Sequence, residues 1–271
     1  MSFKIGFATE YSEENQNKVT GTVQKVQPVP RRSVVQVKFP GRGMSLAYYN
    51  DSFDIKCGDM VYVDGKLEGQ LGRVIEVNYN FKIKISEYKR VIAVVDTTVH
   101  GQFFMAGSHF VTFDREALPE HKIAGWFKAP PKEEDMFISG SDDTTFNLYD
   151  LNDMKISAAI AERGHQYYIE NRVLYISIDG AKGYAIVKGS ENYEVEFEYH
   201  NGEISSLTCS CFCSYNCKHE FAAMLQLKET LELIEKQYSD EYKSTGYFAA
   251  VEKGTLFAFA IDRRDSGTFI L

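Results

Sequence analysis

The sequence predicts an α+β protein, with a small β-barrel-like domain at its N-terminus and a second domain that combines an antiparallel sheet with helices. Short β-branched and aromatic runs, separated by turn residues, fill residues 19–95 without a convincing helix between them, which is typical of a small barrel or sandwich. Alternating strands follow at 173–208, and an apolar helical stripe lies at 221–236. A chain of 271 residues is long enough for two domains, each with its own core.

The first domain, placed at residues 1–98, is expected to contain strands alone. These strands are expected at 19–26, 33–39, 45–49, 60–63, 73–78, 82–85 and 91–95. Residues 57–63 and 69–74 resemble the small barrels of KOW-type domains, in which glycines form the turns and valines fill the interior. The resemblance implies a KOW-like barrel at the N-terminus. Residues 99–152 are expected to form a connecting β and linker region.

The second domain, placed at residues 153–271, is expected to be the larger. A helix is expected at 153–163, with Asp153 as its N-cap and Gly164 just beyond its end. Strands at 173–178, 184–187, 193–199 and 203–208, a helix at 221–236 and a closing hairpin after residue 255 complete the domain. Asn201-Gly202 is a strong hairpin turn, and the alternation of apolar residues with glutamates before it predicts a half-buried antiparallel strand.

The charge of the chain is acidic but unevenly distributed. The formal net charge is −8, yet residues 1–100 carry 14 basic and 11 acidic side chains, whereas the remainder carries 16 basic and 27 acidic ones. An acidic protein is poorly suited to coating nucleic acid without specificity, although a local basic stripe is compatible with this total. No P-loop motif occurs, so we expect any motor activity to belong to a separate partner or to a region outside this sequence.

Composition and the N-terminal sequence predict the cellular compartment. Hydrophobic residues make up 44% and charged residues 25% of the chain, which is ordinary for a globular protein. The N-terminus has no signal-peptide pattern, and the longest apolar runs fall far below the roughly 18 residues of a membrane-spanning helix. We therefore expect a cytoplasmic protein that does not insert into a membrane.

The most informative feature is a cluster of thiols with a histidine beside it. Four of the five cysteines, Cys209, Cys211, Cys213 and Cys217, fall within nine residues, and His219 follows closely. In a chain without a secretory signal, such clustering indicates a metal site rather than disulfides. Zn²⁺ takes four tetrahedral thiolate and imidazole ligands, roughly 2.3 Å from sulfur and 2.0–2.1 Å from nitrogen. Two ligands leaving a strand and two entering a helix would supply this set.

The crowding of candidate ligands favours a closed structural site. A catalytic zinc usually has three protein ligands and keeps one position open for water, whereas here four or five candidates lie in one short segment. Cys217 is expected near the start of a helix, where unpaired N–H groups and the positive end of the helix dipole favour a thiolate. We therefore expect a structural Zn²⁺ and no catalytic residues.

The order Cys-x-Cys, a short gap and Cys-x-His resembles SWIM-type zinc fingers, as in bacterial Swi/Snf-type ATPases and Mutator-type transposases. The similarity covers about residues 155–236 and includes 161–164, 187–190 and 217–225. The zinc ligands that the resemblance implies are Cys209, Cys211, Cys217 and His219.

Two positions depart from the SWIM pattern. The family often has proline after its second cysteine, where this chain has Phe212, and the gap before the third cysteine is short and contains Cys213. Cys213 could replace Cys211 as a ligand or mark a loose site. We expect Cys213 to be a bystander.

Basic residues between positions 25 and 42 are the candidate contacts for nucleic acid. They are Lys25, Arg31, Arg32, Lys38 and Arg42. With Phe39, Tyr48 and Tyr49 nearby, such a loop could follow a phosphate backbone and stack bases. The more ordinary interpretation is a solvated basic face on a small barrel.

These features together predict a non-enzymatic, zinc-binding interaction module. The resemblance implies that it binds nucleic acid, a protein partner or both, beside a Swi/Snf-type ATPase. The acidic second half favours a protein partner for the zinc domain itself, whereas DNA would bind at residues 25–42. No small-molecule substrate is indicated. The rival interpretations are a zinc-dependent hydrolase or nuclease, and a fragment of a larger DNA-remodelling protein.

Overall fold

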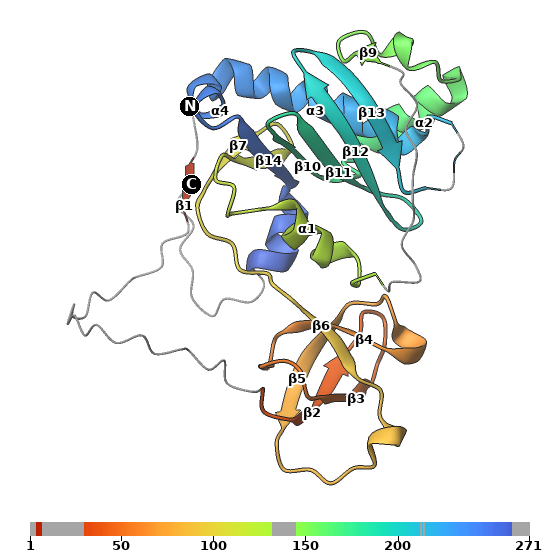
Figure 1. The fold of residues 1–271 in the computed structure, drawn as a ribbon, viewed down its shortest axis with the longest axis vertical. Coiled ribbons are helices and arrows are strands. Elements are labelled where there is room, and N and C mark those ends of the chain that lie inside the picture. The colour runs from red at the N-terminus through yellow and green to blue at the C-terminus, as the bar shows by residue number, and fades with distance from the viewer. Residues whose placement is uncertain (1–3, 7–29, 132–144, 212, 214, 262–271) are drawn as a thin grey trace, which may run out of the picture. The chain divides into compact units, whose positions relative to one another are not determined.

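The chain forms two compact units, which we call the small unit and the large unit (Figure 1). The computed structural model describes residues 4–6, 30–131, 145–211, 213 and 215–261. The small unit contains the described residues of 8–96 together with 128–130, and the large unit contains those of 1–7, 97–127 and 131–271. Both sheets are antiparallel, and helices accompany the larger one, so the expected α+β class is confirmed.

The small unit is a five-stranded antiparallel sheet. In spatial order its strands are β3 (Ser45–Asn50), β2 (Ser33–Lys38), β5 (Gly72–Asn78), β4 (Met60–Val63) and β6 (Val91–Val95), with 3₁₀ turns η1 (Gly65–Leu67) and η2 (Ile85–Glu87) in the connections. Val35 and Val37, two positions apart on β2, are fully buried with Val61 and Val74. The period-2 pattern of β-branched residues thus places the core of this unit.

The sheet of the small unit does not close into a full barrel. Among the described residues, edge strand β3 meets the residue that precedes β6 in a single isolated bridge, between Tyr49 and Arg90. The Tyr49 N–H donates to the Lys89 carbonyl at 2.8 Å, and Arg90 forms an ion pair with Asp51 at 2.6 Å. The barrel prediction is therefore confirmed only as a small all-β unit.

One strand expected in the described part of this region is not observed. Residues 82–85 lead into the turn η2 instead of forming a strand, and Ile85 is about half exposed despite the alternating pattern. This segment leads from β5 to β6, and β4 lies between these two strands in the sheet. The segment therefore has to pass β4 and does not extend β5. The strand expected at 19–26 lies outside the described residues.

The large unit is built on a nine-stranded antiparallel sheet. In spatial order its strands are β1 (Lys4–Gly6), β7 (Gln102–Ala106), β8 (His109–Thr112), β14 (Tyr247–Glu252), β10 (Val173–Asp179), β11 (Lys182–Lys188), β12 (Asn192–His200), β13 (Glu203–Cys209) and β9 (Phe146–Asn147). Its helical segments are α1 (Glu120–Phe127), η4 (Leu151–Met154), α2 (Ala158–Ile169), α3 (Lys218–Gln237), α4 (Ser239–Thr245), α5 (Lys253–Leu256) and the π-helical turn η5 (Phe257–Ile261). No helix among the described residues is long and apolar enough to cross a membrane.

The main core lies between the sheet and helix α3. Met224 and Leu227 of α3 are completely buried against sheet residues that include Ile176 and Phe248. Apolar residues three and four positions apart form one stripe of a helix, so the sequence of α3 dictates which face packs on the sheet. Helix α2 lies beside α3, and its residues Tyr167 and Tyr168 pack against the same core.

The opposite face of the sheet is covered by α1 and the segment from α5 to η5. Because neighbouring strand residues point to opposite faces, Tyr175 faces away from α3, and its hydroxyl donates to the Leu118 carbonyl at 2.7 Å. Trp126 of α1 is buried and stacks on Phe259, with ring centroids 4.8 Å apart. The large unit therefore has three layers.

Helix α2 differs from the sequence prediction in its bounds. The helix expected at 153–163 begins later, because Lys155 has a positive φ of 52° and Ser157 caps α2 by accepting from the Ile160 N–H. The helix then runs through Gly164 to Ile169.

The closing hairpin expected after residue 255 is also wrong. The Glu252 carboxylate accepts from the N–H groups of Gly254 and Thr255, which starts a helical segment that continues to Ile261. The rest of the expected hairpin lies outside the described residues. Strand β14, which lies between β8 and β10 in the sheet, was not expected from the sequence.

Candidate metal centre

Three cysteines and one histidine converge where the last strand of a hairpin leads into helix α3. Cys209 ends β13, Cys211 lies in the turn after it, Cys217 is the N-cap of α3, and His219 lies in the first turn of that helix. One potential ligand atom from each residue falls within 4.8 Å of all the others. The four residues are those that the SWIM resemblance implies.

Two distances within the cluster match the sulfur–nitrogen edge of a zinc-centred tetrahedron. The His219 Nδ1 atom lies 3.6 Å from the Cys217 Sγ and 3.8 Å from the Cys209 Sγ. Zinc bond lengths of about 2.3 Å to sulfur and 2.0–2.1 Å to nitrogen give a tetrahedral sulfur–nitrogen edge of about 3.6 Å. The imidazole therefore presents Nδ1 to the thiols at a separation that a single zinc ion could bridge.

The helix start that carries two of the candidate ligands is fixed by a capping box. The Cys217 side chain accepts from the Glu220 backbone N–H, and the Glu220 carboxylate accepts from the Cys217 backbone N–H. Such reciprocal bonds satisfy N–H groups that have no partner within the helix. Just before the helix, the Asn216 side-chain amide donates to the Met154 carbonyl at 2.7 Å.

The strand side of the centre is fixed by β12. The Ser210 N–H donates to the Glu194 carbonyl at 2.9 Å, and the Glu194 N–H donates to the Ser210 hydroxyl at the same distance. This pair of bonds prolongs the β12–β13 pairing beyond Cys209. Cys211 consequently turns back toward the helix start.

Aromatic residues hold the imidazole of His219 in place. The ring is 4% exposed and stacks on Tyr193, with centroids 4.2 Å apart and planes 21° apart. Tyr167 contacts it from α2 at 5.6 Å. A Cβ at Gly189 would lie 2.7 Å from the Tyr193 ring and 3.1 Å from the His219 Nε2, so this position needs glycine for close approach rather than for its backbone angle.

Burial determines the protonation of the candidate ligands. The Cys209 thiol and burial raise the pKa of Cys217 well above its usual range, and burial raises the pKa of Cys211 to about 12. Burial, with the nearby Lys218 ammonium, lowers the pKa of His219 to about 4. At neutral pH without metal, these two thiols keep their protons while the imidazole is neutral, so a metal ion must displace protons from sulfur but not from nitrogen.

Cys213 and Cys57 do not join the cluster. Both are exposed, and the group of potential ligand atoms contains Cys211 in place of Cys213. The backbone N–H of Cys213 instead hydrogen-bonds to the Cys211 side chain, which partly offsets the effect of burial on the pKa of that thiol. The bystander role of Cys213 stays a prediction.

Helix α2 approaches the start of α3 closely at Gly164. A Cβ at this position would lie 2.8 Å from the Phe221 ring and 3.0 Å from the Lys218 backbone oxygen. Gly164 is thus the crossing point of two helices, although its residue type suggested the end of one. The sequence pattern does not distinguish these uses of glycine.

Gly164→Ala is expected to destabilise the large unit by about 1–3 kcal/mol, because the added methyl group overpacks the helix crossing, and to weaken metal binding by displacing the first turn of α3. Gly125→Ala in α1 is the matched control, since a Cβ there meets nothing within 4 Å and alanine favours a helix by about 1 kcal/mol. Thermal denaturation and zinc titration of both variants provide the measurement. Equal effects at the two positions would contradict the close crossing.

The predicted nucleic-acid contacts do not form one cluster. Arg31 and Arg32 precede β2, with the Arg31 guanidinium 4.2 Å from the Tyr79 ring centroid, whereas Lys38 and Arg42 lie at the other end of this strand. Six strand residues span about 20 Å. All four basic side chains are exposed, and Lys25 lies outside the described residues.

The aromatic part of that prediction is wrong. Phe39, Tyr48 and Tyr49 are 5% exposed or less and belong to the interior of the small unit. Their rings are therefore not accessible for stacking on bases.

A second group of accessible residues lies beside the metal centre and was not identified from the sequence. Arg163 of α2, Lys218 of α3 and Tyr215 line a cavity of about 340 Å³ that extends to Cys217 and His219. Tyr215 is 86% exposed. Arg163 is brought to this surface by the crossing of α2 over α3, which no local sequence signal indicates.

Comparison with known proteins gives no relative: no family model, curated protein or solved structure matches this chain. The Cys3His arrangement itself is therefore the basis for any statement about function.

Proposed function

We propose that Cys209, Cys211, Cys217 and His219 bind one structural zinc ion, and that this ion stabilises a binding module of SWIM type. The observation that carries the proposal is the convergence of four ligand atoms within 4.8 Å from a strand end and a helix start. Thiolate and imidazole ligands suit Zn²⁺ better than they suit hard cations such as Mg²⁺ or Ca²⁺. Bound zinc would link the β12–β13 hairpin to α3.

The proposed role of the ion is structural because the protein supplies all four tetrahedral ligands. A hydrolytic zinc needs an open position for water, and a nearby general base. The carboxylate nearest the centre in sequence, Glu220, is 5% exposed and is engaged with the backbone of Cys217. This engagement favours the interaction module over the rival zinc hydrolase or nuclease.

The surface beside the centre supports single-stranded nucleic acid as the partner. Tyr215 offers an accessible ring, and Arg163 and Lys218 provide positive charge around the same cavity. Aromatic stacking combined with cations along the backbone is the usual way to bind a single strand without sequence readout. The basic residues Arg31 and Arg32 of the small unit are a separate candidate surface.

Tyr215→Ala is expected to weaken binding of a fluorescein-labelled 20-nucleotide DNA strand by about tenfold, because one base–aromatic stack contributes about 1–3 kcal/mol. Tyr149→Ala is the matched control: this tyrosine is 48% exposed and also lies near a lysine, Lys228, but at another place in the large unit. Fluorescence anisotropy at two salt concentrations measures the affinity and its salt dependence.

A second arm of this experiment separates the two candidate surfaces. If binding is unchanged in Tyr215→Ala but is lost in Arg31→Glu/Arg32→Glu, the small unit is the contact and the surface beside the zinc is not. If the wild-type protein does not bind the DNA strand at all, single-stranded DNA is excluded as the partner and the proposed role of Tyr215 is wrong.

A further inference from the structure

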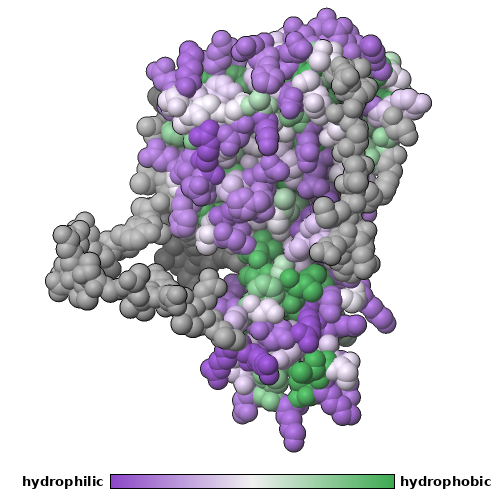
Figure 2. Space-filling model, viewed as in Figure 1, coloured by the Kyte–Doolittle hydropathy of each residue, from purple (hydrophilic) through white to green (hydrophobic). Residues whose placement is uncertain are grey.

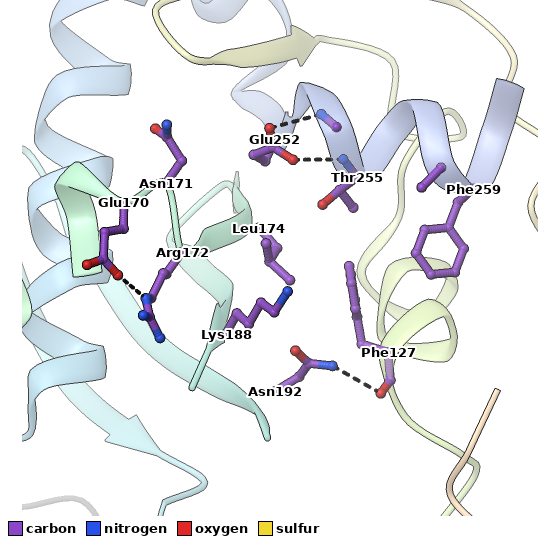
Figure 3. Close-up of a pocket in the computed structure, with 12 residues that line it drawn as sticks. Phe127, Glu170, Asn171, Arg172, Leu174, Lys188, Asn192, Glu252, Thr255 and Phe259 are labelled. Atoms are coloured by element: carbon purple, nitrogen blue, oxygen red, sulfur yellow. Dashed lines mark hydrogen bonds and ion pairs between the residues drawn. The ribbon is translucent and has the colours of Figure 1, made fainter. Parts of the chain in front are cut away.

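A second pocket of the large unit lies at one end of its sheet and does not include the metal ligands. It is formed where β10 and β12 begin and where β11 and β14 end, between the last residues of α2 and the segment from α5 to η5 (Figure 3). The pocket has a volume of about 790 Å³. Protein sites for small molecules commonly measure about 300–1,000 Å³.

One wall of the pocket is apolar and fixed in position. It is formed by Phe127, Leu174, Ala258 and Phe259. The Phe127 and Phe259 rings meet edge to face with centroids 5.5 Å apart, and Phe259 also stacks on the buried Trp126. These contacts preorganise a surface suited to a flat apolar group.

The carboxylates around the pocket already have partners. Glu170 forms an ion pair with Arg172, and Glu252 accepts from the N–H groups of Gly254 and Thr255. Glu170 is thus paired with a cation, whereas the Glu252 carboxylate is held in place at the start of α5 by backbone N–H groups.

The ammonium group of Lys188 is a cation of the pocket lining that lacks a carboxylate partner among the described residues. Lys188 makes no ion pair within the described part of the chain. Figure 3 shows its side chain directed into the space between Leu174 and Asn192, with Phe127 beyond. The Asn192 amide donates to the Phe127 carbonyl at 3.4 Å, which places a second polar group at the same side of the pocket.

We propose that this pocket binds an organic anion with a flat apolar body. The anionic group, a carboxylate or a phosphate ester, pairs with the Lys188 ammonium, while the apolar body lies against Phe127, Leu174 and Phe259. Such a division between an apolar wall and one positioned charge is what gives small-molecule sites affinity and orientation. This small-molecule site is independent of the proposed binding of nucleic acid.

The pocket can be tested with a matched pair of fluorescent probes. We expect the full chain to bind 8-anilinonaphthalene-1-sulfonate more tightly than its uncharged analogue N-phenyl-1-naphthylamine. Lys188→Gln should weaken binding of the sulfonate by about tenfold, as expected for loss of a charge-assisted hydrogen bond, without changing binding of the uncharged probe. Lys182→Gln, at the other end of β11 and also exposed, is the control that removes the same charge and should leave both affinities unchanged.

Displacement of the sulfonate identifies the preferred anionic group. 1-Naphthoate and 1-naphthyl phosphate share an apolar body, so the tighter competitor indicates a carboxylate or a phosphate site. The proposal is overturned if Lys188→Gln and Lys182→Gln bind the sulfonate equally, because the charge at position 188 would then have no role. It is also overturned if the uncharged probe binds as tightly as the sulfonate.

Discussion

Removal of the proposed zinc ion by a strong chelator is expected to lower the melting temperature of the large unit by at least about 10 °C. For a domain of this size, that shift corresponds to about 3–5 kcal/mol of unfolding free energy. Structural zinc contributes on the order of 10–16 kcal/mol in isolated zinc-finger peptides. The expected loss here is smaller, because the core between α3 and the sheet includes Met224, Leu227 and Phe248 and does not depend on the metal.

The loss of stability on metal removal should be concentrated at the junction between β13 and α3. Without a metal the buried thiols of Cys211 and Cys217 keep their protons, so the attraction between ion and thiolates is absent. The His219 ring retains its aromatic contacts and its weak contacts with the Cys209 and Cys217 sulfurs. Hydrogen exchange should therefore increase at the first turn of α3 and change little at the centre of the sheet.

Thermal denaturation with and without chelator, followed by addition of Zn²⁺ or Mg²⁺, measures this effect. Zn²⁺ should restore the original melting temperature, and Mg²⁺ should not. Acidification should release the metal as well, because protons compete for the thiolates. A melting temperature that is unaffected by the chelator, although the metal has been removed, would contradict a structural role for the ion.

Cys211→Ser is expected to cause a large loss of zinc affinity. Loss of an outer-shell partner of a metal site typically costs 10–100-fold in affinity, so loss of a ligand should lower zinc affinity by at least about 100-fold. Cys213→Ser should change the zinc affinity by less than about threefold. The Cys213 side chain is exposed, and only its backbone N–H contacts the Cys211 sulfur. A serine at position 213 keeps that N–H.

Competition with a chromophoric chelator gives the zinc affinity of each variant. Cys57→Ser is the matched control, because it removes an exposed thiol from the small unit. If Cys213→Ser loses the metal while Cys211→Ser retains it, the ligand set proposed here is wrong at that position. The exposed Cys213 would then have to turn inward when the metal binds.

The sequence was most informative where a pattern is local. Residues 60–63 and 91–95 are strands with the expected bounds, and the Asn201-Gly202 turn joins the expected pair of strands. Each of these features depends on alternation or turn chemistry within a few residues. The spacing of Cys209, Cys211, Cys217 and His219 is local in the same sense, since all four lie within one turn and its flanking elements.

The sequence was least informative where two distant segments meet. Gly164 suggested a helix end because its tight contact with Phe221 becomes visible only once α2 and α3 are packed. The central strand β14 lies far along the chain from its neighbours β8 and β10. The pocket around Lys188 likewise combines residues from 127 to 259, so no local pattern identifies it.

The most direct test of the proposed centre is the zinc content of the full chain purified without added metal. Elemental analysis combined with native mass spectrometry should find about one zinc per chain in the wild-type protein and none in Cys217→Ser. Protein that contains no metal and does not take up Zn²⁺ at neutral pH would contradict the proposal. The four residues would then form only a packed group of thiols and an imidazole at the start of α3.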